Sequence, residues 1–251
     1  MTSLKFALSS LVAISIGFAS TACNAAPAQK SATAGAVSKL TIELDTTGIA
    51  KTTKVEIVPK DPYGEDGDIS LSGSPMHTRI IFDGKKLQYG DNSFNEPHLL
   101  IYPVAEYQAV FPRKKQAEFQ KIISDLKKVT AAASDKSLQT MPILPGSDGH
   151  EMLHAQTRRV NFTQGSGVSY VSVYGNGDPP VNESDFFYTF QGLTKDGRYY
   201  VSFFWPVKAA GMPKDLPLAK SQKYAENLSR AKFVPSLETL DRVVGSISLK
   251  Y

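Results

Sequence analysis

The sequence predicts an α+β fold in which an antiparallel sheet is packed by helices. Three observations support this prediction. Short alternating or aromatic runs, joined by turn residues, fill residues 158–205 and are typical of an antiparallel meander. An apolar stripe over residues 114–132 predicts an amphipathic helix in the middle of the chain. The pattern after residue 221 indicates two further helices and a closing strand.

The first half of the chain predicts short strands followed by helix. Apolar or β-branched residues alternate with polar ones at residues 39–45, 53–59, 78–82 and 98–102. Residues 61–73 are rich in Gly, Asp and Ser and predict a loop. A short helix is expected at residues 104–111, because Pro112 ends it. The longer helix follows, with Phe119, Ile122, Leu126 and Val129 on its apolar face.

The second half predicts the meander and its cover. We expect strands at residues 160–162, 168–174, 186–191 and 198–205, with turns at 164–167 and 195–197. The strand at 198–205 is apolar or aromatic on both faces, so it should lie centrally with cover on both sides. Ser221 and Ser236 are expected to cap the two C-terminal helices. Residues 246–251 should form a strand that returns to the sheet.

The start of the chain predicts export. Lys5 precedes an apolar run over residues 6–19, and Ser20, Thr21 and Ala22 lead to Cys23, the single cysteine of the chain. This start resembles that of bacterial lipoproteins, which are cut before a cysteine whose thiol carries a diacylglycerol. Ser20 departs from the apolar residue usual in that family. The alternative is ordinary secretion, with the cut after Ala22 or Ala25.

The resulting organisation is a signal peptide over residues 1–22, a lipid-anchored flexible tether over 23–38 and a single α+β domain over 39–251. The resemblance implies attachment to the outer membrane or cell surface through a lipid at Cys23; without the lipid the protein would be periplasmic or secreted. The net charge is only +4, and the basic residues are scattered among acidic ones along the chain, so no nucleic-acid partner is expected.

One motif carries chemistry of its own. His150, Glu151 and His154 form the pattern HEMLH of zinc peptidases, in which two imidazoles four residues apart on a helix bind one zinc and the glutamate polarises a water molecule. We expect the motif on a short helix. A catalytic zinc needs a third protein ligand, and Thr157 and Val160 occupy the positions where a longer form of the motif requires Gly and His.

Other candidates have simpler interpretations. The tyrosines of the meander are a possible binding face, but packing within the sheet is the preferred interpretation for Tyr170, Tyr174, Tyr188 and Tyr200. Glu65, Asp66 and Asp68 are interpreted as an acidic turn, because Leu71 stands where a calcium loop of the EF-hand type needs Gly. His77 and His98 are expected to be structural.

Several stretches resemble a group of uncharacterised exported bacterial proteins. They are LLIYPVAEY (99–107), GSGVSY (165–170), FYTFQGLTKDGRYYV (187–201) and FVPSL (233–237). The resemblance implies export and brings no activity with it. We therefore interpret the protein as a surface-tethered, non-enzymatic domain that binds an unknown protein or small molecule and needs no cofactor. The alternative is a zinc peptidase with His150 and His154 as ligands and Glu151 as catalytic base.

Overall fold

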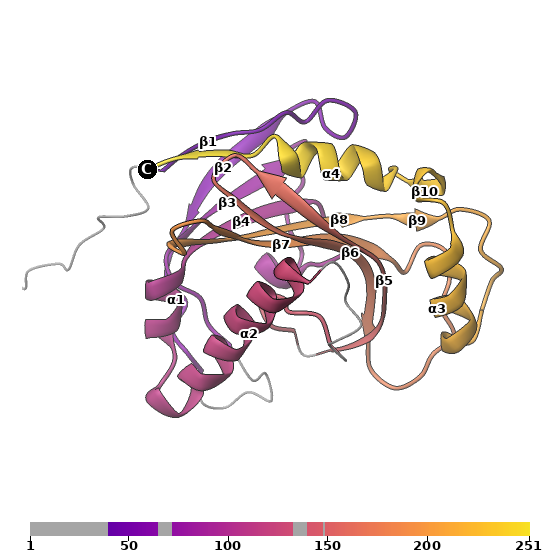
Figure 1. The fold of residues 1–251 in the computed structure, drawn as a ribbon, viewed down its shortest axis with the longest axis horizontal. Helices are drawn as coiled ribbons and strands as arrows, with labels where there is room; N and C mark the ends of the chain where they lie inside the picture. The colour runs from indigo at the N-terminus through magenta and orange to yellow at the C-terminus, as the bar shows by residue number, and fades with distance from the viewer. Residues whose placement is uncertain (1–39, 65–71, 133–139, 148) are drawn as a thin grey trace, which may run out of the picture. The chain divides into compact units, whose positions relative to one another are not determined.

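The computed structural model describes residues 40–64, 72–132, 140–147 and 149–251, and a seven-stranded antiparallel sheet forms its centre (Figure 1). The strands lie in the order β2-β3-β4-β8-β7-β6-β5. Their bounds are β2 Thr53–Val58, β3 His77–Phe82, β4 His98–Pro103, β5 His150–Phe162, β6 Gly165–Gly175, β7 Phe187–Thr194 and β8 Tyr199–Pro206. Helices pack on this sheet, which confirms the predicted α+β class.

Strand β8 lies between β4 and β7, at the middle of the sheet, as its composition predicted. Tyr200 and Phe204 point to one face, and Val201 and Phe203 point to the other. All four side chains are buried. A strand without a polar face is stable only where both faces are covered, and the structure covers both.

Helices α1 (Val104–Val110) and α2 (Arg113–Ala131) cover one face of the sheet, below it in Figure 1. Their bounds agree with the predicted helices to within about one residue. Helices α3 (Leu218–Asn227) and α4 (Leu237–Gly245) contribute to the core on the opposite face. The sheet thus separates two hydrophobic cores, one beneath each pair of helices.

Two small sheets complete the fold. Strand β1 (Thr41–Glu43) pairs with β11 (Ser248–Lys250), and β9 (Lys208–Ala209) pairs with β10 (Phe233–Val234). The prediction that the last strand returns to the main sheet was therefore wrong. Ile42 and Leu249 face each other in the β1–β11 pair and pack onto the α3–α4 core. The apolar side chains of the last strand are therefore buried without pairing of that strand with the main sheet.

One of the two predicted helix caps is confirmed. The Ser236 hydroxyl accepts a hydrogen bond from the Thr239 N–H at 3.2 Å, at the start of α4. The prediction for Ser221 was wrong, because α3 begins three residues earlier, after Pro217. The Ser221 hydroxyl is buried inside the helix and donates to the carbonyl of Leu216 at 3.0 Å.

The predicted turn at residues 164–167 was also placed too late, since Gly165 and Gly167 belong to β6. A Cβ atom at Gly165 would lie 2.1 Å from the Leu193 carbonyl oxygen. A Cβ atom at Gly167 would lie equally close to the Gln191 carbonyl oxygen. These glycines therefore allow close approach of β6 to β7 rather than a turn.

The predicted signal peptide, the tether with Cys23 and the acidic residues Glu65, Asp66 and Asp68 lie outside the described residues. In the described part of the chain, no helix is both long enough and apolar enough to cross a bilayer.

Candidate functional site

A cavity of about 560 Å³ lies on the α1–α2 side of the sheet, between α2 and residues 140–147 and 149–151. We call it the α2 cavity. Its described lining combines apolar and polar side chains, which are Ile122, Met141, Pro142, Ile143, Tyr174, Glu118, Lys121, Asp125, Thr140, Ser147, His150 and Glu151. A largely apolar wall with a few polar groups is typical of small-molecule sites.

Met141, Pro142 and Ile143 line the cavity, and the segment that carries them is held to the sheet. The Leu144 N–H donates to the Gln191 side-chain oxygen at 3.1 Å, and the Ser202 hydroxyl donates to the Leu144 carbonyl. The Tyr170 hydroxyl donates to the Pro142 carbonyl at 3.3 Å. Gln191 and Ser202 are fully buried polar residues in the middle of the sheet. These two side chains form hydrogen bonds with the backbone N–H and carbonyl of Leu144, in a segment without regular secondary structure that crosses the α1–α2 face of the sheet.

Glu151 places a buried carboxylate in this lining, with its side chain only 2% exposed. Its carboxylate accepts from the Met141 N–H at 2.8 Å and from the Ser172 hydroxyl at 3.5 Å. The His154 Nδ1 atom lies 3.3 Å from the same carboxylate. No lysine or arginine of the described chain is within ion-pair distance of Glu151.

A β-bulge brings Glu151 and His154 together. Glu151 pairs with Tyr174 and His154 pairs with Ser172, so the register shifts by one residue at Met152. In a regular strand, residues three apart point to opposite faces. The extra residue in the bulge restores both side chains to the α1–α2 face.

The expected helix at residues 150–154 was wrong, because these residues open the 13-residue strand β5. Leu153 and Ala155 of this strand are buried in the α3–α4 core, so tertiary packing favours the strand. His150 and His154 are thus about 13 Å apart along an ideal strand, whereas a helix would bring them to about 6 Å. The described residues contain no group of three or more His, Cys, Asp or Glu side chains that could hold a metal ion.

Two other carboxylates of the lining already have lysine partners. Asp125 is bound by Lys121 and by Lys128, the latter at 3.1 Å, and these hydrogen bonds lower the pKa of Asp125 despite its burial. Glu118 lies 2.8 Å from Lys115. Glu151 differs from both, because its hydrogen-bond donors are a backbone amide and a hydroxyl.

Tyr174 forms an aromatic wall of the cavity. Its ring packs edge-on against Phe94, with centroids 5.3 Å apart, and against Phe187 at 5.8 Å. Burial, and to a smaller extent the charge of Glu151, raise the pKa of the Tyr174 hydroxyl. Tyr170, Tyr188 and Tyr200 are buried in the two cores, which confirms their predicted packing role.

A second polar cluster on the same side is structural. Asp91 lies 2.8 Å from the His77 ring and 3.0 Å from the Arg79 guanidinium. The two ring nitrogens of His98 lie 2.8 Å from the Glu96 carbonyl and 3.1 Å from the Asp91 carbonyl. Both histidines are fully buried, so the cluster holds the loop before β4 against the sheet, as the structural interpretation of His77 and His98 predicted.

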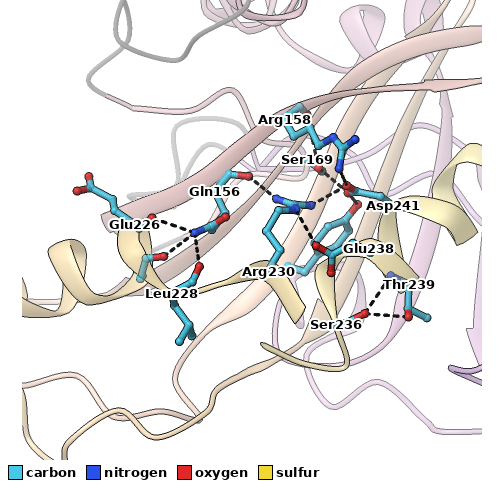
Figure 2. Close-up of polar contacts among 12 residues, drawn as sticks. Gln156, Arg158, Ser169, Glu226, Leu228, Arg230, Ser236, Glu238, Thr239 and Asp241 are labelled. Carbon is cyan, nitrogen blue, oxygen red and sulfur yellow. Dashed lines mark hydrogen bonds and ion pairs between the residues drawn. The ribbon is translucent and has the colours of Figure 1, made fainter. Parts of the chain in front are cut away.

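The opposite face of the sheet carries a buried carboxylate of another kind (Figure 2). Asp241 of α4 accepts from the Ser169 hydroxyl at 2.8 Å, the Tyr188 hydroxyl at 2.9 Å and the Arg230 guanidinium at 2.6 Å. Arg158 of β5 approaches the same carboxylate to 3.5 Å. Figure 2 shows that these groups converge from several elements, and we call them the Asp241 clamp.

The Asp241 clamp extends to α3 through the backbone of β5. Arg230 also donates to the Gln156 carbonyl at 2.9 Å, and the Gln156 side-chain amide donates to the carbonyls of Ala225 and Leu228 at the end of α3. Gln156 has a positive φ of 62° at the second bulge of β5, which turns its amide toward α3. The clamp therefore docks the helices and opens onto no cavity described above.

Comparison with protein-family models, curated proteins and solved structures found no match for this chain. The candidate site therefore rests on its own geometry. The sequence pointed to His150 and Glu151, but as parts of a zinc site on a helix. It did not indicate that residues 140–147 and Tyr174 would help to form a cavity. The apolar run Met141 to Leu144 was a signal for burial, but nothing in it indicated which face it would cover.

Proposed function

We propose that this protein is an exported, lipid-anchored and non-enzymatic binding protein that holds a small molecule in the α2 cavity. The observation that carries the proposal is the cavity of about 560 Å³ with its apolar wall and buried Glu151 carboxylate. Its volume lies within the range of small-molecule sites. The hydrogen bonds that fix Pro142 and Leu144 to the sheet support a preformed site, since a ligand would not have to order the segment that carries the lining residues Met141, Pro142 and Ile143.

The start of the sequence supports the anchoring part of the proposal. Cys23 follows an apolar run and small residues, as in bacterial lipoproteins, and the residues after it are rich in Ala, Ser, Pro and Gly. A diacylglycerol on the Cys23 thiol would place the binding domain at a membrane surface. The tether would separate the cavity from the lipid headgroups.

Binding of an apolar fluorescent dye tests the site. The measurement uses the Cys23→Ser chain, because a chain without the lipid can be purified without detergent, which would otherwise compete for the cavity. Ile122→Trp should fill the cavity and weaken dye binding by about tenfold or more, because added bulk excludes the ligand. Val55→Trp is the matched control, since Val55 is exposed on β2, and should bind the dye as the parent does. Equal dye binding by both tryptophan variants, or no binding by the parent, would contradict the proposed site.

Anchoring is tested by mass spectrometry of the mature amino terminus. We expect a peptide that begins at Cys23 and carries the mass of a diacylglycerol and any further acyl chain. The Cys23→Ser chain should leave the membrane fraction. A mature chain at the membrane with an unmodified Cys23 would contradict this part of the proposal.

A further inference from the structure

We infer that the ligand of the α2 cavity is an organic cation with an apolar body, bound through its ammonium group to Glu151. This inference rests on the proposed function and names the ligand class of the same site. It follows from three features of the described lining: a buried carboxylate without a permanent cation, the sign of the remaining charges, and a fixed aromatic ring beside the carboxylate.

The first feature is the charge of Glu151. A buried carboxylate is costly unless a partner of opposite charge compensates it. Asp91 and Asp241, whose side chains are each 12% exposed, have Arg79 and Arg230 as partners, and Asp125 has Lys121 and Lys128. The Glu151 side chain is only 2% exposed, which is a smaller exposed fraction than that of any of these three aspartates.

The donors around Glu151 include no lysine or arginine of the described chain. Met141 and Ser172 supply neutral donors, and the His154 ring at 3.3 Å supplies a positive charge only when it is protonated. A bound ammonium would provide a charge that does not depend on the state of His154.

The second feature is the charge of the surrounding wall. Glu118 and Asp125 line the same cavity, and Lys121, the lysine among the described lining residues, is bound to Asp125. Glu118 is compensated by Lys115, and Asp125 by Lys121 and Lys128, so Glu151 is the one carboxylate of the described lining with no lysine or arginine partner. The attraction for a cation, and the repulsion of an anion, therefore come chiefly from Glu151.

The third feature is the pairing of an aromatic ring with apolar surface. The Tyr174 ring is held by Phe94 and Phe187, so its position is fixed before a ligand binds. An ammonium group near an aromatic face gains additional electrostatic attraction. Ile122, Met141 and Ile143 supply apolar surface for the rest of the molecule.

The inference is tested with three probes of equal chain length: octyltrimethylammonium, octanol and octyl sulfate. Each is titrated by calorimetry, below its micelle concentration, into the Cys23→Ser chain. We expect the ammonium to bind about tenfold or more tightly than the alcohol, and the sulfate to bind most weakly. Added salt should weaken ammonium binding more than alcohol binding.

Glu151→Gln identifies the carboxylate responsible. The amide keeps the size of the side chain and its acceptor for the Met141 N–H, but it removes the charge. Ammonium affinity should fall by about tenfold or more while alcohol affinity stays within about twofold. Glu118→Gln is the matched control: Glu118 lines the same cavity, is 42% exposed and already has Lys115, so ammonium affinity should change by about twofold or less.

Tyr174→Leu provides a second variant in case Glu151→Gln fails to fold. It should weaken ammonium binding and spare alcohol binding, because it keeps apolar surface and removes the ring. Equal affinity for ammonium and alcohol, or unchanged ammonium affinity in Glu151→Gln, would overturn the inference and leave the cavity as a neutral-ligand site. Failure of every probe and of the apolar dye would overturn the proposed function itself.

Discussion

Asp241 and Glu151 are buried carboxylates on opposite faces of the same sheet, and their surroundings differ in charge. Asp241 is met by two arginines and two hydroxyls contributed by separate elements. Glu151 is met by a backbone amide, a hydroxyl and a histidine, and it borders a cavity. The contacts of the first carboxylate hold separate elements of the protein together, whereas the second is the carboxylate that we propose for ligand binding.

The difference teaches how the contacts of a buried carboxylate separate a structural role from a candidate binding role. A buried charge with permanent partners and no adjacent cavity stabilises the fold. A buried charge without a permanent partner, beside a cavity, is a candidate for ligand recognition. The predictions below test whether these two carboxylates behave as differently as their contacts indicate.

The largest expected effect is that of Asp241→Asn on stability. The variant removes the nearer carboxylate partner of Arg230 and leaves only Glu238, 3.8 Å away, and breaking a largely buried ion pair costs about 3 kcal/mol of unfolding free energy. For a chain of this size that corresponds to a melting temperature lower by roughly 6–12 °C. Urea and thermal unfolding of the Cys23→Ser background measure it.

Glu238→Gln is the control for this prediction. Glu238 is half exposed and lies 3.8 Å from Arg230, so its loss should cost about 0.5 kcal/mol or less. Comparable destabilisation by both variants would show that the Asp241 clamp is no more than a set of surface contacts.

A second effect concerns pH. Burial lowers the pKa of His98, against the opposing hydrogen bonds to the Glu96 and Asp91 carbonyls, so the folded protein takes up this proton less readily than the unfolded chain. Stability is therefore present above the unfolded histidine pKa of about 6.5 and is lost as pH falls below it. His98→Gln should reduce the decline of unfolding free energy between pH 7 and 5.

His150→Gln is the matched control. His150 is exposed, so the variant should leave that decline unchanged.

Asp91 adds a loss of stability of the same sign at lower pH. Burial raises its pKa, but the hydrogen bonds and charges of His77 and Arg79 outweigh burial and lower it. Its stabilisation is therefore present above about pH 4 and is lost below. Stability that rises on acidification from pH 7 would contradict both assignments.

Ser236→Ala tests whether α4, which carries Asp241, also depends on its cap. Removing the hydroxyl that accepts from the Thr239 N–H should cost about 1 kcal/mol, seen as a lower urea midpoint with an unchanged slope. Ser236→Asp keeps an acceptor and should restore most of that loss. A neutral Ser236→Ala would mean that the clamp alone positions the helix.

Only a small effect on stability is expected for Glu151→Gln. The amide oxygen still accepts from the Met141 N–H and the buried charge is removed, so unfolding free energy should change by about 1 kcal/mol or less, in either direction. Circular dichroism during urea unfolding measures this. A loss as large as that of Asp241→Asn would make Glu151 a structural carboxylate and remove the contrast between the two faces.

The local elements were largely predictable from sequence. The apolar stripe of α2, the two-faced composition of β8 and the cap at Ser236 each depend on residues close together in the chain, and the structure confirms them. The periodicity of apolar residues shows which face of a segment is buried, and a capping residue shows where a helix starts. They do not report which distant segment supplies the burial.

Tertiary structure decided the site. The pattern HEMLH has the spacing of a helical zinc motif, but pairing with β6 and burial of Leu153 made it a strand. The bulge at Met152, which brings Glu151 beside His154, depends on that pairing. Residues 141–143 line the cavity because hydrogen bonds from β6 and β7 hold their segment on the sheet. Sequence by itself determined the alternation and the helical stripes, because they are local. The cavity and the position of the Glu151 carboxylate in its lining arose from contacts between remote segments, which local patterns do not encode.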